Sequence, residues 1–190
     1  MDSSARRQLS KLASYALRHR PDLYGLHPDA EGWVSIKEFL RAARATGGAL
    51  TNVTAADLAE TVAQADKQRH ELNEHSIRAL YGHSLAGTIA KPQAEPPETL
   101  FHGTSPAAWA LIQRVGLWPM SRQYVHLSVD QAMARQVGGR RGPDVVILAV
   151  QAAAASRSGT TFRLGNDRVW LADPVPPEYL SVANCWTRNS

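Results

Sequence analysis

The sequence contains a single cysteine, Cys185, among its 190 residues. One cysteine excludes an internal disulfide and any zinc site built from cysteines, and it fits a reducing cytoplasm. The chain also lacks an apolar run near the roughly 18 residues that a transmembrane helix requires, and its N-terminus lacks the apolar core of a signal peptide. We therefore expect a cytoplasmic protein that does not bind a membrane.

Two common nucleotide-binding motifs are missing as well. No GxGxxG follows a predicted strand, and residues 138–142 (GGRRG) lack the lysine and the hydroxyl of a phosphate-binding P-loop. These absences argue against a Rossmann or P-loop site for NAD or ATP. The net charge of +4 is a modest bias toward polyanions, and arginine, whose planar guanidinium suits phosphate, greatly outnumbers lysine.

The first part of the chain has the pattern of three helices followed by a β-hairpin. Helical and alternating spacings of apolar residues predict helices over 6–18, over 36–45 and after Thr54, and strands over 68–72 and 76–81. Ser35 and Glu38 have the spacing of a capping box at the start of the second helix. Three helices closed by a hairpin are typical of winged-helix proteins, so residues 1–84 are predicted to form a winged-helix-like lobe. This scaffold commonly binds nucleic acid, which makes RNA or phosphate binding the expected use, although the fold alone does not establish it.

Residues 85–98 break this periodicity, and their prolines and glycine indicate a linker. Beyond the linker, a second lobe over 99–190 alternates strands with helices, predicted at 99–102, 106–114, 124–128, 130–137, 144–150, 161–164 and 168–172. The run at 144–150 is continuously apolar and rich in β-branched residues, which predicts a central strand. The expected fold class is therefore α+β, with a small mixed β-sheet in the second lobe.

Two of the predicted strands each carry one histidine among apolar residues. Leu100–Thr104 contains His102, and Val125–Ser128 contains His126. A buried histidine needs partners for its ring nitrogens. Two interpretations stay open: the rings form the floor of a binding pocket, or they are core histidines, each bonded to a backbone carbonyl. Arg122 precedes the second strand, where a permanent cation can face a bound anion.

Basic residues also gather at two places in the first lobe. Arg18 and His19 end the first predicted helix, where backbone carbonyls favour cations, so this pair can serve the helix alone. Lys67 and Arg69 open a predicted hairpin strand and share one face of it, a pattern typical of a solvated surface. A bound phosphate dianion would instead require donors from different elements, which Arg18, His19 and Arg69 could supply.

Seven short strings carry a resemblance to a known family. They are Leu9–Leu12 (LSKL) with Leu17–Pro21 (LRHRP), Glu31–Val34 (EGWV), Asp66–Arg69 (DKQR), Ile77–Ser84 (IRALYGHS), the HGT and VHLS strands, and Val169–Leu171 (VWL) with Val175–Leu180 (VPPEYL). In this order they resemble the RNA 2′-phosphotransferases, NAD-dependent enzymes that remove a 2′-phosphate from spliced tRNA. The resemblance covers nearly the whole chain and implies that residues 99–190 form an ADP-ribosyltransferase-like lobe.

The resemblance implies roles for the matching positions. The family's active site is an Arg-His-Arg-Arg set, which falls on Arg18, His19, Arg69 and Arg122. Lys67 is expected to assist phosphate binding, whereas Arg140 and Arg141 compete for the place of the fourth arginine and are otherwise candidates for the RNA backbone. The NAD pocket falls on His102, Gly103, Thr104, His126, Ser128 and Asn166. Gly103 is expected to let the backbone come close to the ligand.

The sequence departs from the family pattern at two places. Asp167-Arg168 replaces a glycine beside Asn166, and Arg168 adds a cation near the predicted pocket. His70 follows the motif arginine, Arg69, where the family usually has Phe or Tyr. We expect His70 to pack as an aromatic ring would.

The resemblance also implies a reaction. An internal 2′-phosphate of a tRNA-like RNA attacks NAD, a co-substrate, and expels nicotinamide; the ribose 2″-OH then attacks that phosphate. The products are 2′-OH RNA, ADP-ribose 1″,2″-cyclic phosphate and nicotinamide, made by a monomer without a metal. Two other classes compete: an ADP-ribosyltransferase acting on terminal phosphates of RNA or DNA, and a non-catalytic winged-helix protein that senses a nucleotide.

Overall fold

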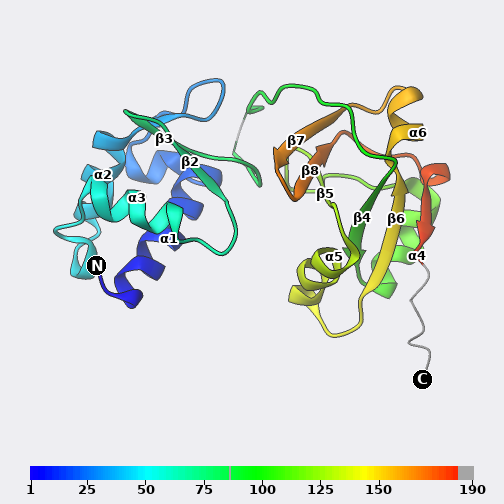
Figure 1. The fold of residues 1–190 in the computed structure, drawn as a ribbon, viewed down its shortest axis with the longest axis horizontal. Helices are drawn as coiled ribbons and strands as arrows, with labels where there is room; N and C mark the ends of the chain where they lie inside the picture. The colour runs from blue at the N-terminus through cyan, green and yellow to red at the C-terminus, as the bar shows by residue number, and fades with distance from the viewer. Residues whose placement is uncertain (86, 184–190) are drawn as a thin grey trace. The chain divides into compact units, whose positions relative to one another are not determined.

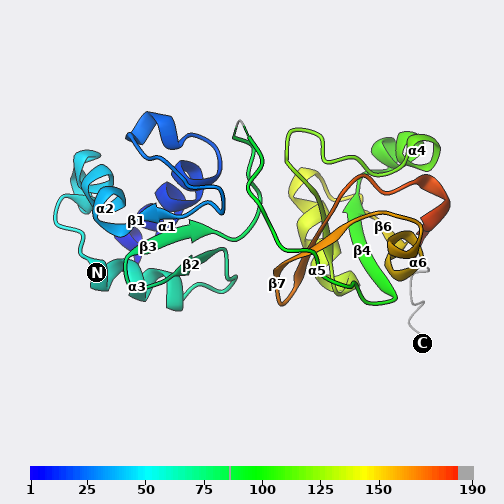
Figure 2. The same ribbon diagram turned by 90° about the horizontal axis from the view of Figure 1, so that it is seen from above.

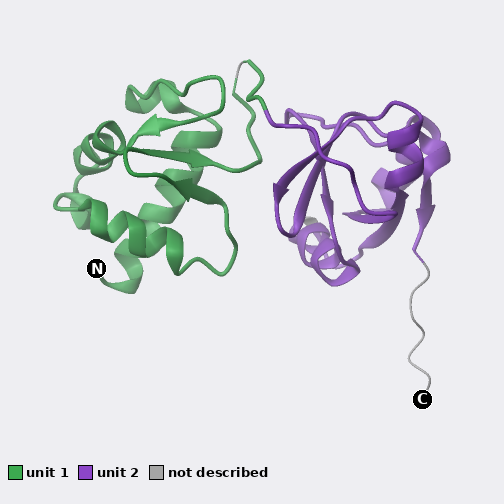
Figure 3. Ribbon diagram, turned by 45° about the horizontal axis from the view of Figure 1, so that its top comes forward, with its two compact units in different colours: residues 1–90 green, residues 91–190 purple. Residues whose placement is uncertain are grey.

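A computed structural model describes residues 1–85 and 87–183 (Figure 1), so Cys185 lies outside the described residues. The chain divides into two compact units, Met1–Ala90 and Lys91 onward (Figure 3). The division falls inside the linker predicted at 85–98. Among the described residues, no helix is both long and apolar enough to cross a membrane.

In its described residues, the first unit contains three α-helices and one antiparallel sheet. The helices are α1 (Ser3–Arg18), α2 (Ile36–Ala45) and α3 (Ala55–Ala63), and the strands are β1 (Val34–Ser35), β2 (His70–Leu72) and β3 (Ser76–Ala79), in the order β1-β3-β2. Short 3-10 turns cover Pro21–Tyr24 and Gly48–Leu50. The core is formed where the buried faces of α1 and α2 meet Val34 and Ile77 of the sheet. The three predicted helices and the hairpin are all present, and β1 is an addition.

Two local predictions about helix caps had different outcomes. Thr54 caps α3 as expected, and it forms a reciprocal capping box with Asp57. The capping box predicted from Ser35 and Glu38 is wrong, because the Ser35 side chain makes no capping hydrogen bond. Ser35 pairs with Ser76 in the sheet instead, so the strand sets the conformation of the residue before α2.

The second unit is built on a six-stranded sheet, counted over its described residues. The strands are β4 (Thr99–Thr104), β5 (Val125–Ser128), β6 (Val146–Gln151), β7 (Phe162–Asn166), β8 (Val169–Ala172) and β9 (Leu180–Val182), in the order β7-β8-β5-β4-β6-β9. The helices are α4 (Pro106–Val115), α5 (Gln131–Gly138) and α6 (Ala152–Arg157), with 3-10 turns at Gly139–Arg141 and Pro177–Tyr179 (Figure 2).

Every neighbouring pair of these strands is antiparallel, so the prediction of a mixed sheet is wrong. The spacing of apolar residues along a strand does not reveal its direction, because it does not show from which end the strand enters the sheet. β6 is an interior strand between β4 and β9, and Ile147, Leu148 and Val150 are buried, in line with the apolar run that predicted it. The strand β9 at the edge was not predicted.

Candidate functional site

Arg18, the last residue of α1, reaches the segment that leads into β2. Its Nη2 donates a hydrogen bond to the carbonyl oxygen of Arg69, 3.2 Å away, and its guanidinium lies 5.1 Å from the centre of the Tyr81 ring. The same Arg69 carbonyl accepts a hydrogen bond from the main-chain N–H of Leu80, at 3.0 Å. Arg18 and Arg69, 51 residues apart, are therefore held together through one carbonyl oxygen.

His19 is held beside Arg18 through both its main chain and its side chain. Its main-chain N–H donates to the carbonyl of Tyr15, and the Tyr15 ring lies 6.1 Å from the imidazole. Nδ1 of His19 is hydrogen-bonded to Oγ of Ser84 at 2.7 Å. A hydroxyl both donates and accepts, so Ser84 can keep this contact whether the imidazole is neutral or protonated. The contact fixes the orientation of the ring.

Lys67 and Arg69 lie before β2, which begins at His70, so the prediction that they share a strand face is wrong. The main chain of Arg69 continues the β2–β3 pairing by one hydrogen bond, whereas Lys67 stands in the loop after α3. The Arg69 and His19 side chains nevertheless line one open groove on the α1 surface. The structure thus brings together three of the four residues predicted as catalytic, Arg18, His19 and Arg69.

His70 is buried behind this cluster, as expected for a residue that packs like an aromatic ring. Its Nε2 lies 3.4 Å from Oγ of Ser14 on α1. Burial, followed by repulsion from the charges of Arg18 and Arg69, lowers the pKa of His70 from 6.5 to about 3. His70 is therefore neutral near pH 7 and adds no positive charge to the cluster.

The two histidines of the second unit meet where β4 and β5 separate. In the described residues, Phe101 pairs with Ser128, and the next link between these strands is a hydrogen bond from Nδ1 of His102 to the carbonyl oxygen of His126, at 2.9 Å. Nδ1 of His126 donates in turn to the carbonyl of Tyr124, also at 2.9 Å. Because a carbonyl only accepts, each ring carries its proton on Nδ1 when it is neutral, which makes Nε2 the acceptor nitrogen. Nε2 of His126 is buried.

This arrangement contains elements of both interpretations offered by the sequence. Each ring has a backbone carbonyl partner, as expected for core histidines, yet both side chains are only half-buried. Thr104, at the end of β4, shares a face of the strand with His102 because side chains alternate. Ser128 is buried at the end of β5 and lies opposite Phe101, on the other face.

Gly103 has a structural role that the sequence did not show. A Cβ atom at this position would lie 2.0 Å from the carbonyl oxygen of Ala134 in α5, too close for any side chain. Gly138 makes the complementary approach, since its Cβ would lie 2.9 Å from the carbonyl carbon of Gly103. The missing side chains let α5 pack directly on β4, so the Gly103 side that faces α5 is filled by protein.

Asn166 ends β7, and Asp167 and Arg168 form the turn to β8. Oδ1 of Asn166 accepts hydrogen bonds from the main-chain N–H groups of Arg168 and Val169, at 3.0 and 2.8 Å. The Arg168 side chain donates to Asp130, the N-terminal cap of α5, at 2.9 Å. Backbone and Arg168 hydrogen bonds lower the pKa of the Asp130 carboxyl. The departure at Asp167-Arg168 thus ties this turn to α5, and its cation is paired with a carboxylate.

The remaining predicted residues lie on loops of the second unit. Arg122 is exposed between α4 and β5, where its N–H donates to the carbonyl of Pro119 in a turn. Met120, two residues earlier, is exposed and has a left-handed backbone (φ 58°). Arg140 is exposed in the 3-10 turn after α5, and Arg141 is the last residue of that turn. The role of Arg122 as the fourth catalytic residue stays a prediction.

Sequence reasoning missed the residues that hold the cluster in place. Tyr15 precedes His19 by four residues, so helical spacing alone places both on one face of α1. Ser84 and Tyr81 belong to the family-like segment Ile77–Ser84, but the neighbouring sequence does not show that they contact α1. Among the described residues, no group of three or more histidine, cysteine, aspartate or glutamate side chains could hold a metal ion.

Comparison with known proteins identifies the family. Residues 4–174 match the model of the RNA 2′-phosphotransferase, Tpt1/KptA family. The chain is 46% identical over 174 residues to a "Probable RNA 2′-phosphotransferase" of Bacillus thuringiensis, covering 92% of this chain and 94% of that protein. It is 47% identical over 173 residues to one of Acetivibrio thermocellus (91% and 94%) and 42% identical over 189 residues to one of Streptomyces griseus (95% and 98%). The chain therefore belongs to the RNA 2′-phosphotransferase family.

Proposed function

We propose that this protein is an NAD-dependent RNA 2′-phosphotransferase. It moves an internal 2′-phosphate of an RNA to NAD, leaving 2′-OH RNA and releasing ADP-ribose 1″,2″-cyclic phosphate and nicotinamide. The observation that carries the proposal is the cluster of Arg18, His19 and Arg69, drawn from two elements 51 residues apart in a member of this family. One basic residue is enough to interact with the free carbonyl groups at the end of a helix. Three basic residues at one point are suited to bind a dianion.

The first unit supplies the donors for the 2′-phosphate. Arginine is permanently charged and offers a planar fork of N–H groups that matches phosphate oxygens. The Arg69 carbonyl and the Tyr81 ring orient the Arg18 guanidinium, so this side chain is already ordered before the phosphate binds. Fixed donors of this kind also stabilise charge that builds on phosphoryl oxygens during transfer. His19 either adds a donor or moves a proton, and Lys67 adds charge nearby.

The second unit offers groups suited to NAD. Two groups stand on one face of β4, where β4 and β5 separate: Nε2 of His102 is an acceptor, and Thr104 carries a hydroxyl. Ser128 and His126, on the neighbouring strand β5, are assigned to the pocket by resemblance to the family alone, because Ser128 is buried on the other face of the sheet. Hydrogen-bonding groups of this kind fit the amide and ribose hydroxyls of the dinucleotide. When bound, NAD supplies a glycosidic carbon that accepts the phosphate, with nicotinamide as leaving group. Arg122 would then stabilise the phosphoryl oxygens in the second step.

Each part of the chain has one task in this reaction. Residues 1–84 act as a winged-helix-like lobe that binds RNA, residues 85–98 as a linker, and residues 99–190 as an ADP-ribosyltransferase-like lobe that binds NAD. The three helices with their antiparallel sheet, and the antiparallel sheet with the splayed β4 and β5, support this assignment. The substrate would be a tRNA-like RNA, processed by a monomer in the cytoplasm.

The experiment uses a short RNA that carries one internal 2′-phosphate, incubated with the protein with and without NAD, and resolves products by mass. We expect NAD-dependent loss of the phosphate and appearance of the cyclic ADP-ribose phosphate. Arg69→Ala should lose the reaction, whereas Arg41→Ala, at an exposed position of α2, should keep it. RNA that carries a stable ADP-ribose would indicate a different acceptor, and unchanged RNA would indicate a nucleotide sensor.

A further inference from the structure

An open groove runs along one face of α1 and extends well beyond the catalytic cluster. Its volume is about 460 Å³, and it is lined by Arg7, Ser10, Lys11, Ser14, Tyr15, His19 and Arg69. The α1 residues recur at intervals of three and four, so they form a single stripe of the helix. At about 1.5 Å of rise per residue, the stripe extends roughly 18 Å from Arg7 to His19.

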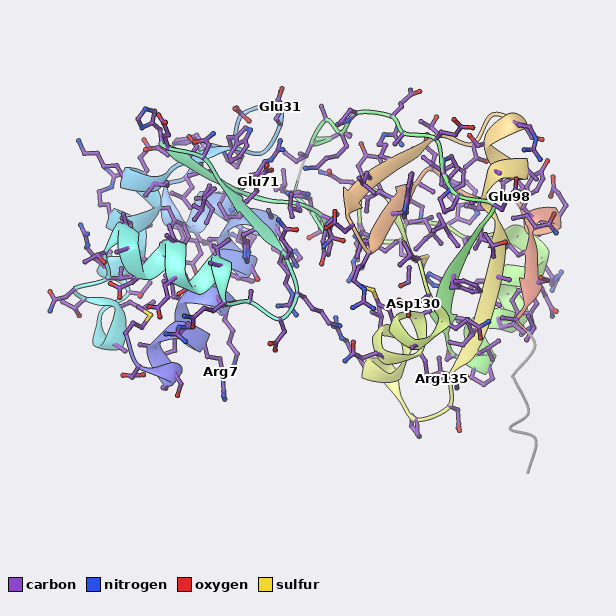
Figure 4. The ribbon with its side chains drawn as sticks, in the orientation of Figure 1. Arg7, Glu31, Glu71, Glu98, Asp130 and Arg135 are labelled. Carbon is purple, nitrogen blue, oxygen red and sulfur yellow. The ribbon has the colours of Figure 1, made fainter. Side chains whose placement is uncertain are left out.

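The charges of this groove have one sign. Arg7, Lys11 and Arg69 are cations, His19 can become one, and no carboxylate is among the lining residues. Two other basic residues at or near α1 form ion pairs: Arg6 binds Glu60 and Arg20 binds Asp22. Arg7 and Lys11 form no ion pair with any described residue, and both are exposed. Figure 4 shows Arg7 extending outward from α1.

The pairing of two like charges at positions 7 and 11 works against the helix. Cations four residues apart on a helix repel each other, which destabilises it slightly. An anion that binds both removes this repulsion, and exposed cations bind phosphate with little cost of desolvation. The hydroxyl of Ser10 lies between these two cations along α1, and that of Ser14 follows toward His19, where His70 contacts Ser14 from behind. Phosphate oxygens accept bonds from both kinds of group.

We propose that this groove binds the phosphodiester backbone of the RNA strand that flanks the 2′-phosphorylated nucleotide, at phosphates beyond those of its immediate neighbours. The inference rests on the proposed function and adds to it a track for the flanking strand, contacted by Arg7 and Lys11. Successive phosphates of an extended strand are spaced much like these two side chains, which lie one helical turn apart. Because the contacts are made to phosphates, the track is indifferent to base sequence.

The test compares two double variants that remove the same charge. The first variant, Arg7→Ala with Lys11→Ala, removes both cations of the proposed track. The second, Lys37→Ala with Arg41→Ala, removes an exposed basic pair of the same spacing from α2, outside the groove. Alanine favours the helix, so both variants should fold. Affinity for a single-stranded RNA without a 2′-phosphate is measured by fluorescence anisotropy at several salt concentrations. KM and kcat are measured with a 2′-phosphorylated trinucleotide and with a longer RNA of the same central sequence.

We expect the Arg7 and Lys11 variant to bind the single strand about 20-fold more weakly at 0.1 M salt, with a salt slope smaller by about 1.4, because each phosphate contact contributes about 0.7. Its KM should rise for the longer RNA only, with kcat and the trinucleotide unaffected. Unchanged affinity and slope, or an equal loss in the α2 variant, would overturn the proposed track. Failure of the unaltered protein to act on the trinucleotide would instead count against the proposed function, while the anisotropy would still test the track.

Discussion

The guanidinium of Arg18 donates a hydrogen bond to the main-chain carbonyl of Arg69, not to a side chain, across 3.2 Å. Arg18 therefore has a structural role besides its proposed chemical one, because it joins the end of α1 to the segment before β2. Arg69 takes part in this link through its backbone alone, and its side chain is directed into the α1 groove. The two arginines should consequently respond differently to substitution.

Replacing either arginine by alanine should lower 2′-phosphate removal by about 100-fold or more, as expected for loss of a fixed donor to developing charge. Arg18→Ala should also lower the free energy of unfolding by about 1–2 kcal/mol, since it removes the bond to the carbonyl and the contact with Tyr81. Arg69→Ala should change it by less than about 0.5 kcal/mol. Urea unfolding and single-turnover kinetics measure the two effects. Equal destabilisation by both variants would contradict the separation of roles.

His70 should make the first unit sensitive to acid. Its pKa is lowered to about 3 in the folded protein, against 6.5 when unfolded, so the unfolded chain binds a proton first as the pH falls. Stability is full above pH 6.5 and is lost below it, by about 2 kcal/mol at pH 5.

His70→Phe should remove this dependence between pH 6.5 and 4 while keeping an aromatic ring in the core. The measurement is urea unfolding of both proteins at a series of pH values. His75→Phe is the control, because this histidine is exposed and its replacement leaves the buried ring in place. Parallel pH profiles for the unaltered protein and His70→Phe would show that His70 does not cause the acid sensitivity.

Gly103→Ala should destabilise the second unit by about 3 kcal/mol or more, because the added methyl group would overlap the carbonyl of Ala134 and force α5 away from β4. Gly139→Ala is the matched control. Its φ is −62°, and its Cβ would meet only Val145 at 3.8 Å, an ordinary contact. Thermal unfolding compares the two, and a stable Gly103→Ala protein would show that α5 can move at little cost.

Two substitutions can test the roles of the two ring nitrogens of His102 separately. The amide nitrogen of His102→Asn can replace Nδ1 and keep the bond to the His126 carbonyl, so the fold should be retained. The acceptor at Nε2 is lost, and we expect the KM for NAD to rise about tenfold or more. His102→Gln places its amide near Nε2 and should lose the link between β4 and β5 instead. If His102→Asn leaves the KM for NAD unchanged, Nε2 does not contact the co-substrate.

Arg122→Ala tests the order in which the arginines act. If Arg122 serves mainly the second step, the variant should accumulate RNA that carries ADP-ribose, detected as a heavier RNA by mass spectrometry. Arg114→Ala, which replaces an exposed arginine at the end of α4, is the control. Loss of nicotinamide release in Arg122→Ala would assign Arg122 to the first step.

The sequence by itself determined the positions of most helices and the family of this protein. The bounds of α2 and the Thr54 cap followed from spacing and cap chemistry, because a helix depends on residues three and four positions apart. The ordered strings pointed to the family that the comparisons then identified.

Only the tertiary structure decided how distant residues meet. The Arg18–Arg69 link spans 51 positions, and the approach of Gly103 to α5 joins residues about 30 positions apart. The pairing of Arg168 with Asp130 and the antiparallel order of the sheet have the same character. Such contacts depend on how whole helices and strands pack, and the energy of packing is shared over many side chains. No short string of residues contains that information.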